Sequence, residues 1–297
     1  MPGIRSPLAA SSTRHHVLAS CAAILMAARL ANAQHASSVL SYEPGTGYAT
    51  EFGSGAGYTN AIAILGVPSR STPGPFGGPV DPFSPPWQPQ QVVSLGAGGS
   101  IEVSLDSPAR RDPAHPFGID LLLFGATGFV IINGDYSGGG ITDGSVFGHD
   151  PSVVRVSVAT ADGPWLTLDP ALAPPIEGLF PTDGAGDFTR AVNPALGSSH
   201  FSGLGIAGIR LAYDGSAGGT GYSLAWARDA SGQPAPINEA SRIRVEVLSG
   251  RVELDAVAAV RPVPEPGVAI MGAAGVLLVG AWARQRPRVA NAHTEAR

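Results

Sequence analysis

Three stretches in which apolar and polar residues alternate constrain the fold of this 297-residue chain more than any other feature. In residues 101–106, 154–159 and 242–247, every second side chain is Ile, Val or Leu, and most of those between are polar. Successive side chains of a strand point to opposite faces, so this period indicates strands with one buried and one hydrated face. No stretch between the chain ends shows a convincing helical period, and 40 glycines and 27 prolines supply turns.

Further apolar runs raise the expected number of strands to roughly nine or ten. These runs are residues 92–95, 119–124, 129–132, 165–168, 209–213, 222–226 and 252–257. Residues 96–99 are expected to form a hairpin loop. The proline-rich residues 68–89 are expected to be either an ordered loop over the strands or a mobile flap. The sequence therefore predicts an all-β fold, a jelly-roll-type β-sandwich.

The end of the chain has three parts in a fixed order. They are a tripeptide, an apolar run and a basic cluster, formed by Pro264, Glu265 and Pro266, by residues 267–283, and by Arg284, Arg286 and Arg288. As a helix the apolar run reaches about 26 Å, just short of a ~30 Å hydrocarbon core. The positive-inside rule keeps the arginines cytoplasmic and the tripeptide outside. The alternative is a buried C-terminal core helix, which would be amphipathic and would not end in arginines.

The start of the chain predicts a secretory signal peptide over residues 1–33. Basic residues precede an apolar stretch at 17–28, and Ala31 and Ala33 supply the small residues of a cleavage site. Cleavage after Ala33 leaves Gln34 first. The chain's one cysteine, Cys21, lies inside this segment, so the remaining domain has neither disulfides nor a thiolate nucleophile.

The Pro-Glu-Pro tripeptide, the membrane segment and the arginine cluster together resemble the PEP-CTERM sorting signal of Gram-negative bacteria. The resemblance implies export by the Sec machinery and processing by an exosortase, a membrane-embedded protease. It also implies an intermediate anchored in the inner membrane and a final place at the cell surface or in the extracellular matrix. The chain then divides into a signal peptide (1–33), a β-sandwich ectodomain (34–261), the sorting signal (262–288) and a cytoplasmic tail (289–297).

Several segments of the body, between residues 64 and 260, carry a second resemblance. They read PFSPPWQPQQVVSLG, GLFPTDG, DFTRAVNPAL, YDGSAGGTG and VELDAVAAV. In this order they resemble a group of exported bacterial proteins without an established activity, many of which carry PEP-CTERM tags. The resemblance implies a secreted β-sandwich and nothing catalytic. Where that group leads us to expect an aspartate, this chain has Ser223, which puts a ligand role there in doubt.

Charge and motifs exclude several classes of function. Between Gln34 and Val263 there are 11 arginines and 21 carboxylates, a balance of −10, so no basic stripe is available for nucleic acid, whereas divalent cations are compatible. No metal-ligand spacing links the histidines His35, His115, His149 and His200, which are expected to be solvated loop residues. The sequence contains no nucleophile elbow, and we expect no enzymatic activity.

Carboxylates and aromatic side chains are the remaining candidate functional groups. Asp120 interrupts one apolar strand and Asp255 another, where a charge is costly unless it is paired or metal-bound. Calcium is therefore a candidate cofactor at either residue; the alternatives are pairing with an arginine, capping of loop amides or, for Asp255, exposure to solvent. Asp183 and Asp187 are weaker candidates. Trp87, in the proline-rich segment, is a candidate ligand-stacking residue, whereas Trp165 and Trp226 are expected in the core.

Two hypotheses from different classes follow. The first is an exported, non-catalytic surface or matrix protein that uses its sandwich for adhesion or for association with extracellular polysaccharide. The second is a secreted glycan hydrolase that uses two carboxylates as acid and base. A concave face with two carboxylates about 5 to 10 Å apart, flanked by aromatic residues, would favour the second.

Overall fold

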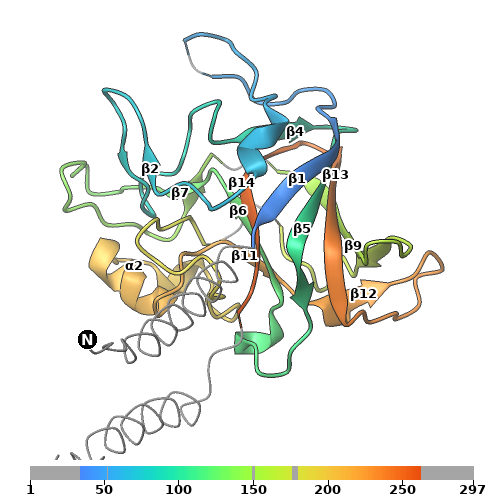
Figure 1. Ribbon diagram of the computed structural model, residues 1–297. Coiled ribbons are helices and arrows are strands. Elements are labelled where there is room, and N and C mark those ends of the chain that lie inside the picture. The colour runs from blue at the N-terminus through green and yellow to red at the C-terminus, as the bar shows by residue number, and fades with distance from the viewer. Residues whose placement is uncertain (1–33, 52, 149–150, 176–179, 262–297) are drawn as a thin grey trace, which may run out of the picture. The chain divides into compact units, whose positions relative to one another are not determined.

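The computed structural model of the protein describes residues 34–51, 53–148, 151–175 and 180–261. The signal peptide, with Ala31 and Ala33, and the whole sorting signal lie outside these ranges. Strands make up most of the regular secondary structure of the described residues, beside one α-helix, so the fold is all-β as the sequence predicts (Figure 1). No helix within this part of the chain has the length and apolar character needed to cross a membrane.

Two large antiparallel sheets form the domain. The six-stranded sheet has the order β1 (Ala36–Glu43), β5 (Ser100–Arg110), β13 (Glu239–Ser249), β9 (Val153–Ala159), β10 (Leu166–Leu168) and β12 (Ala227–Arg228). The four-stranded sheet has the order β11 (Thr220–Tyr222), β6 (Leu121–Gly125), β14 (Arg251–Ala259) and β4 (Val93–Gly96). Two small hairpins lie apart from them: β2 (Ser71–Thr72) with β3 (Gly78–Pro79), and β7 (Gly128–Phe129) with β8 (Val146–Phe147).

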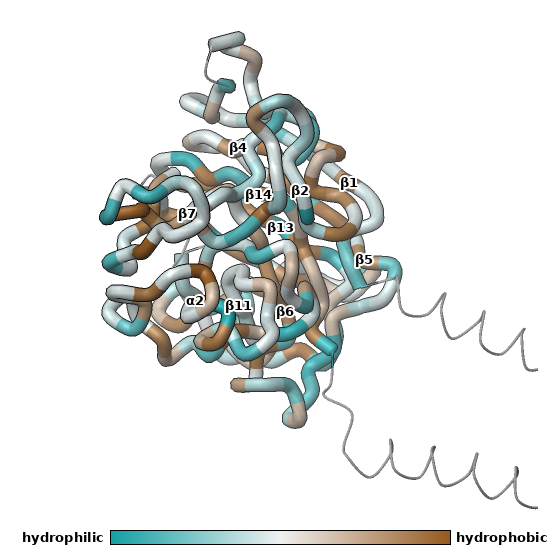
Figure 2. Tube along the Cα trace, turned by 90° about the vertical axis from the view of Figure 1, so that its left-hand side faces the viewer, coloured by the Kyte–Doolittle hydropathy of each residue, from teal (hydrophilic) through white to brown (hydrophobic). Residues whose placement is uncertain are grey.

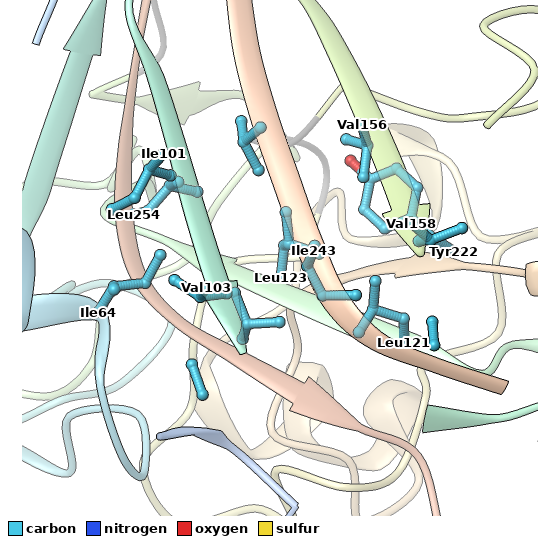
Figure 3. Close-up of a cluster of buried hydrophobic side chains, with 14 of the residues drawn as sticks. Ile64, Ile101, Val103, Leu121, Leu123, Val156, Val158, Tyr222, Ile243 and Leu254 are labelled. Atoms are coloured by element: carbon cyan, nitrogen blue, oxygen red, sulfur yellow. The ribbon is translucent and has the colours of Figure 1, made fainter. Parts of the chain in front are cut away.

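The two large sheets share one hydrophobic core. The alternating residues of β5, β9 and β13 point their apolar side chains toward those of β6 and β14 (Figure 3). The side chains that meet there include Ile101, Val103, Leu121, Leu123, Val156, Val158, Tyr222, Ile243 and Leu254. The period-2 pattern of the sequence is therefore the pattern of this interior.

The apolar run at residues 209–213, predicted to be a strand, is instead part of helix α2 (Ile206–Tyr213). Ile209 and Tyr213 are four residues apart and both are buried, which places them on one helix face. The helix is short, so a run of five residues gave no periodicity to separate it from a strand. Four 3-10 turns complete the helical elements of the described chain: Ala61–Ile64, Pro116–Gly118, Ser198–His200 and Leu224–Trp226.

Several strands adjacent in sequence lie in different large sheets, whereas β9 and β10 pair within one. Residues 97–99 connect β4 to β5, and Gly250 connects β13 to β14, in each case between different sheets. The predicted hairpin at residues 96–99 is therefore wrong, because its two strands do not pair with each other. The β4–β5 connection bonds instead to β13, since Gly98 N donates to Val247 O at 2.8 Å and Val247 N donates to Gly99 O at 2.9 Å.

The outer face of the four-stranded sheet is covered by long connecting segments. Leu122 and Phe124 of β6, with Ala256 and Ala258 of β14, pack there against Phe188 and other residues of the connection that precedes α2. In Figure 1 the hairpins of β2 and β7 and the helix α2 all lie on one side of the large sheets, and Figure 2 views the molecule from that side. This layer of loops, outside both sheets, holds the cleft of the candidate site.

Candidate functional site

A cleft of about 410 Å³ opens in the loop layer. Its volume falls in the range of about 300 to 1,000 Å³ that small-ligand sites occupy. The β2–β3 hairpin, the segment that follows it and the β7–β8 hairpin form its walls. The lining residues are Thr72, Phe76, Gly77, Gly78, Pro79, Asp81, Phe83, Ser84, Pro85, Trp87, Ala126 and Phe147. Two segments about fifty residues apart in sequence therefore meet at one concave surface.

The proline-rich segment is a loop held by its own hydrogen bonds. Tyr58 Oη donates to the carbonyl of Trp87 at 2.6 Å, and the side-chain amides of Gln88 and Gln91 donate to Pro73 O and Ser71 O at 3.1 and 3.0 Å. Phe129 N, on β7, donates to Pro82 O at 2.7 Å and joins the two walls. These bonds fix the backbone that carries Trp87, the residue that the sequence singled out for ligand stacking.

Aromatic rings make up much of the lining. Trp87 is 38% exposed, Phe147 44% and Phe76 88%, and a half-buried Phe83 lies beside them. A Cβ atom on Gly128 would stand 2.7 Å from the ring of Phe147 and 2.8 Å from Pro85, so the glycine allows the two walls to approach this closely. Exposed rings in a concave site are the arrangement that stacks against the CH faces of a sugar or the face of another flat group.

Asp81 is the one ionisable residue among those that line the cleft. Its Oδ1 accepts hydrogen bonds from Phe83 N at 2.8 Å and Ser84 N at 3.0 Å. Burial raises the pKa of the Asp81 carboxyl, and the charge of nearby Asp183 raises it further, against the lowering effect of these two amides and of Arg210. The lining also includes Thr72, whose buried Oγ1 has no hydrogen-bond partner among the described residues.

Asp183 lies behind this lining, where it anchors helix α2. Arg210 donates to it from Nε at 2.7 Å and from Nη2 at 2.9 Å, so the pair is bidentate. Asp187, the other acidic candidate of this loop, accepts hydrogen bonds from the amide and the hydroxyl of Thr189 at 2.8 and 2.7 Å. Both carboxylates shape the loop, and neither belongs to the cleft lining.

Asp120 is buried at the start of β6, where it holds two loops together. Its Oδ1 lies 2.8 Å from His115 Nδ1, and its Oδ2 accepts from Leu224 N at 2.9 Å and from Ser223 Oγ at 3.3 Å. Of the alternatives considered for this residue, the capping of loop amides is the one observed. His115 is 4% exposed, so its expected place in a solvated loop is wrong. Ser223 occupies the position where an aspartate was expected, and it donates to Asp120.

Asp255 is buried at a bulge of β14. The pairing with β6 shifts register between Leu254 and Ala256, which places the extra residue on the outer face of the sheet. The two carboxylate oxygens accept from Ser69 N and Ser69 Oγ, both at 2.8 Å. Burial raises the pKa of Asp255 to about 7, against the opposing effect of the two Ser69 donors. The carboxyl thereby ties the segment that leads into β2 to the sheet.

Calcium binding at Asp120 or Asp255 stays a prediction. Both carboxylates have protein donors, and within the described ranges no three His, Cys, Asp or Glu side chains lie close enough to share a metal ion.

The core positions expected for Trp165 and Trp226 are only partly confirmed. Trp226 packs half-buried against the core, whereas Trp165 lies half-exposed with the guanidiniums of Arg244 and Arg242 at 4.2 and 5.0 Å from its ring centroid.

Most of the cleft escaped prediction from the sequence. Trp87 was identified, but Thr72, Phe76, Asp81, Phe83 and Phe147 were not. The available signal was the PFGGPVDPFSPPW segment, in which aromatic residues and one aspartate recur among prolines within a stretch expected to lie on the surface.

Compared with known proteins, the chain matches no family model, and no curated protein shows significant similarity to it.

Proposed function

We propose that this protein is an exported cell-surface or matrix protein whose β domain binds extracellular polysaccharide without catalysis. The observation that carries the proposal is the cleft in which Trp87, Phe76 and Phe147 present partly exposed rings beside one carboxylate, Asp81. Sugar rings combine apolar CH faces with hydroxyl donors, and such a lining offers a partner for each. The net negative charge of the domain argues against nucleic acid as a ligand, because its phosphates would be repelled.

The topology supports a jelly-roll-type sandwich as the finer description of the fold. Every strand pair in the two large sheets is antiparallel. The chain passes between the sheets from β4 to β5, from β5 to β6 and from β13 to β14. Alternation of consecutive strands between two antiparallel sheets is the connectivity that jelly rolls share.

The route to the cell surface rests on the sequence of the two chain ends. The signal peptide predicts export by the Sec machinery. The sorting signal at residues 262–288 predicts an intermediate anchored in the inner membrane and processing by an exosortase. Its critical residues are Pro264, Glu265, Pro266, Arg284, Arg286 and Arg288. A binding domain released from this anchor reaches the polysaccharide outside the cell, so the proposed ligand is present at the proposed final location of the protein.

The glycan hydrolase remains the alternative. It requires two carboxylates that face one substrate, about 5 to 10 Å apart. The cleft lining contributes Asp81, and the neighbouring Asp183 is bonded to Arg210 behind it. Release of reducing sugar from a bound glycan, lost in Asp81→Asn, would establish this alternative and overturn the non-catalytic proposal.

Glycan binding by the fragment of residues 34–261 tests the proposal. Both large sheets and the cleft lie within these bounds, so the fragment retains every contact described here. We expect binding to bacterial polysaccharides on a glycan array, weakened at least about tenfold by Trp87→Ala, because aromatic anchors dominate such contacts. Trp165→Ala is the matched control, since it removes the same side chain just before β10, outside the cleft lining. Equal loss in both variants, or no binding by the folded wild-type fragment, would contradict the proposal.

A further inference from the structure

We propose that the aromatic cleft binds an ammonium group, so that its ligand is a polysaccharide of amino sugars with free amino groups. This inference rests on the polysaccharide-binding function proposed above and names the class of glycan. Three features carry it: the rings of the cleft, the sign of its charge and an unpartnered hydroxyl.

The rings of the cleft are available to a cation. An ammonium over an aromatic face is attracted by the negative potential of the ring, most strongly for tryptophan. In the part of the chain that the structure describes, the cation–π contacts are made by Arg70 over Phe188 and by two arginines over Trp165. None of them uses Phe76, Phe83, Trp87 or Phe147. The cleft therefore has aromatic faces without a cation over them.

The charge of the cleft favours the same ligand. Asp81 is the one ionisable lining residue, and its oxygens lie in a partly desolvated site. Asp183 behind it is neutralised by the bidentate bonds of Arg210, so the charge that faces the cleft is that of Asp81. A ligand ammonium in the cleft would pair with this carboxylate. A uronate, in contrast, would bring a second carboxylate into the cleft and be repelled.

The hydroxyl of Thr72 is the second polar anchor. Thr72 is 7% exposed, lines the cleft, and its Oγ1 is buried without a hydrogen-bond partner among the described residues. A buried hydroxyl without a partner is unfavourable, and a ligand hydroxyl that reaches it removes this cost. Asp81 for the amino group and Thr72 for a neighbouring hydroxyl are therefore the two polar contacts that we assign to one sugar ring.

Calorimetric titration of the 34–261 fragment with oligosaccharides of equal length tests the inference. The probes are β-1,4-linked oligomers of glucosamine, N-acetylglucosamine, glucose and glucuronate. At about pH 6 an amino sugar carries its proton, as an α-amino group does. We expect the glucosamine oligomer to bind about tenfold more tightly than its acetylated and glucose counterparts, the glucuronate oligomer to bind least, and added salt to reduce the preference for glucosamine.

Two variants locate the effect. Asp81→Asn keeps the oxygen that accepts from Phe83 N and Ser84 N, so the turn is retained while the charge is lost. It should abolish the preference for glucosamine and leave binding of the glucose oligomer within about twofold. Asp162→Asn, at an exposed position on the β9–β10 turn, removes the same charge and should leave the preference intact.

The outcomes separate this inference from the proposed function. If the oligomers of glucosamine, acetylglucosamine and glucose bind equally well, or if Asp81→Asn keeps the preference, the ammonium site is wrong and polysaccharide binding stands. If none of the probes binds to a fragment that unfolds cooperatively, and a bacterial glycan array also gives no signal, both are wrong. Selective binding of the glucuronate oligomer would likewise overturn the amino-sugar assignment.

Discussion

The Asp255 carboxyl makes the stability of the domain depend on pH. Burial raises its pKa to about 7 in the folded chain, whereas an unfolded aspartate has a pKa of about 3.9. Between these values the folded state holds a proton that the unfolded state has lost. Stability from this group is therefore greatest below about pH 4, falls as pH rises, and is at its minimum above about pH 7.

Asp255→Asn should remove this dependence. The amide accepts from Ser69 N through its oxygen and donates to Ser69 Oγ through its nitrogen, so the tie to the sheet is kept. At about 1.4 kcal/mol per pKa unit, we expect the variant to be more stable than wild type at pH 8 by on the order of 4 kcal/mol, and about equal to it at pH 4. Urea titrations of both proteins across this range measure the difference. A constant difference at all pH values would contradict the assignment.

Phe117 is strained by its backbone. Its φ is 60° and its ψ is 12°, a left-handed conformation that disfavours residues with a Cβ, and its side chain is 54% exposed. Phe117→Gly and Phe117→Ala both remove the ring, but only glycine relieves the backbone. We expect the glycine variant to be more stable than the alanine variant by about 1 kcal/mol in urea unfolding. Equal stabilities would show that this loop holds no such strain.

At the scale of elements, the connection from β13 to β14 depends on one glycine. Gly250 has φ +75°, and a Cβ there would stand 2.2 Å from Pro151 O, so alanine must displace backbone. Gly232 has φ +78° with nothing within 4 Å, which makes it the matched control for the dihedral alone. We expect Gly250→Ala to cost about 2 kcal/mol more than Gly232→Ala in thermal or urea unfolding. Equal costs would contradict the close approach of Gly250 to the backbone of Pro151.

The elements that the sequence predicted are those whose pattern is purely local. Strands β5, β9 and β13 each contain a stretch of alternating apolar and polar residues, and these strands were found. Strand β1 was missed because bulges between Ala36 and Ser38 and between Val39 and Ser41 break its period. Helix α2 was mistaken for a strand. The signal that would have identified it is Ile206, Ile209 and Tyr213 at helical spacing, followed by Asp214 in a left-handed cap at φ 50°.

The sequence did not predict the cleft because its walls come from segments far apart in the chain. The hairpin that carries Thr72 and Phe76 meets the hairpin that carries Phe147 only because both cover the outer face of the four-stranded sheet. No property of either segment alone indicates the other, so Trp87 was found by its residue type, and the walls around it were not. The buried partners of Asp120 were missed likewise, since Ser223 and Leu224 lie about a hundred residues further along the chain.

At the scale of the whole molecule, the two ends of the described chain lie together. Gln34 O accepts a hydrogen bond from Ala259 N at 2.7 Å, His35 forms an antiparallel bridge with Ala258, and Arg261 donates to the side chain of Gln34. The predicted cleavage after Ala33 and the predicted sorting signal from residue 262 therefore flank one point at the end of β14. The first and last residues of the domain are thus hydrogen-bonded to each other, between the two predicted processing signals.

This arrangement makes processing of the tail separable from folding of the domain. Replacement of Pro264, Glu265 and Pro266 by alanine should block removal of the tail in a host with exosortase, so that the mature protein keeps the higher mass by mass spectrometry. The tripeptide follows the last strand, so the melting temperature of the domain should stay unchanged. Pro262→Ala is the matched control and should be processed normally, and a host without exosortase should leave all forms at the higher mass. A processed mass for the triple variant would overturn the sorting signal, whereas a lowered melting temperature would place these residues in the fold.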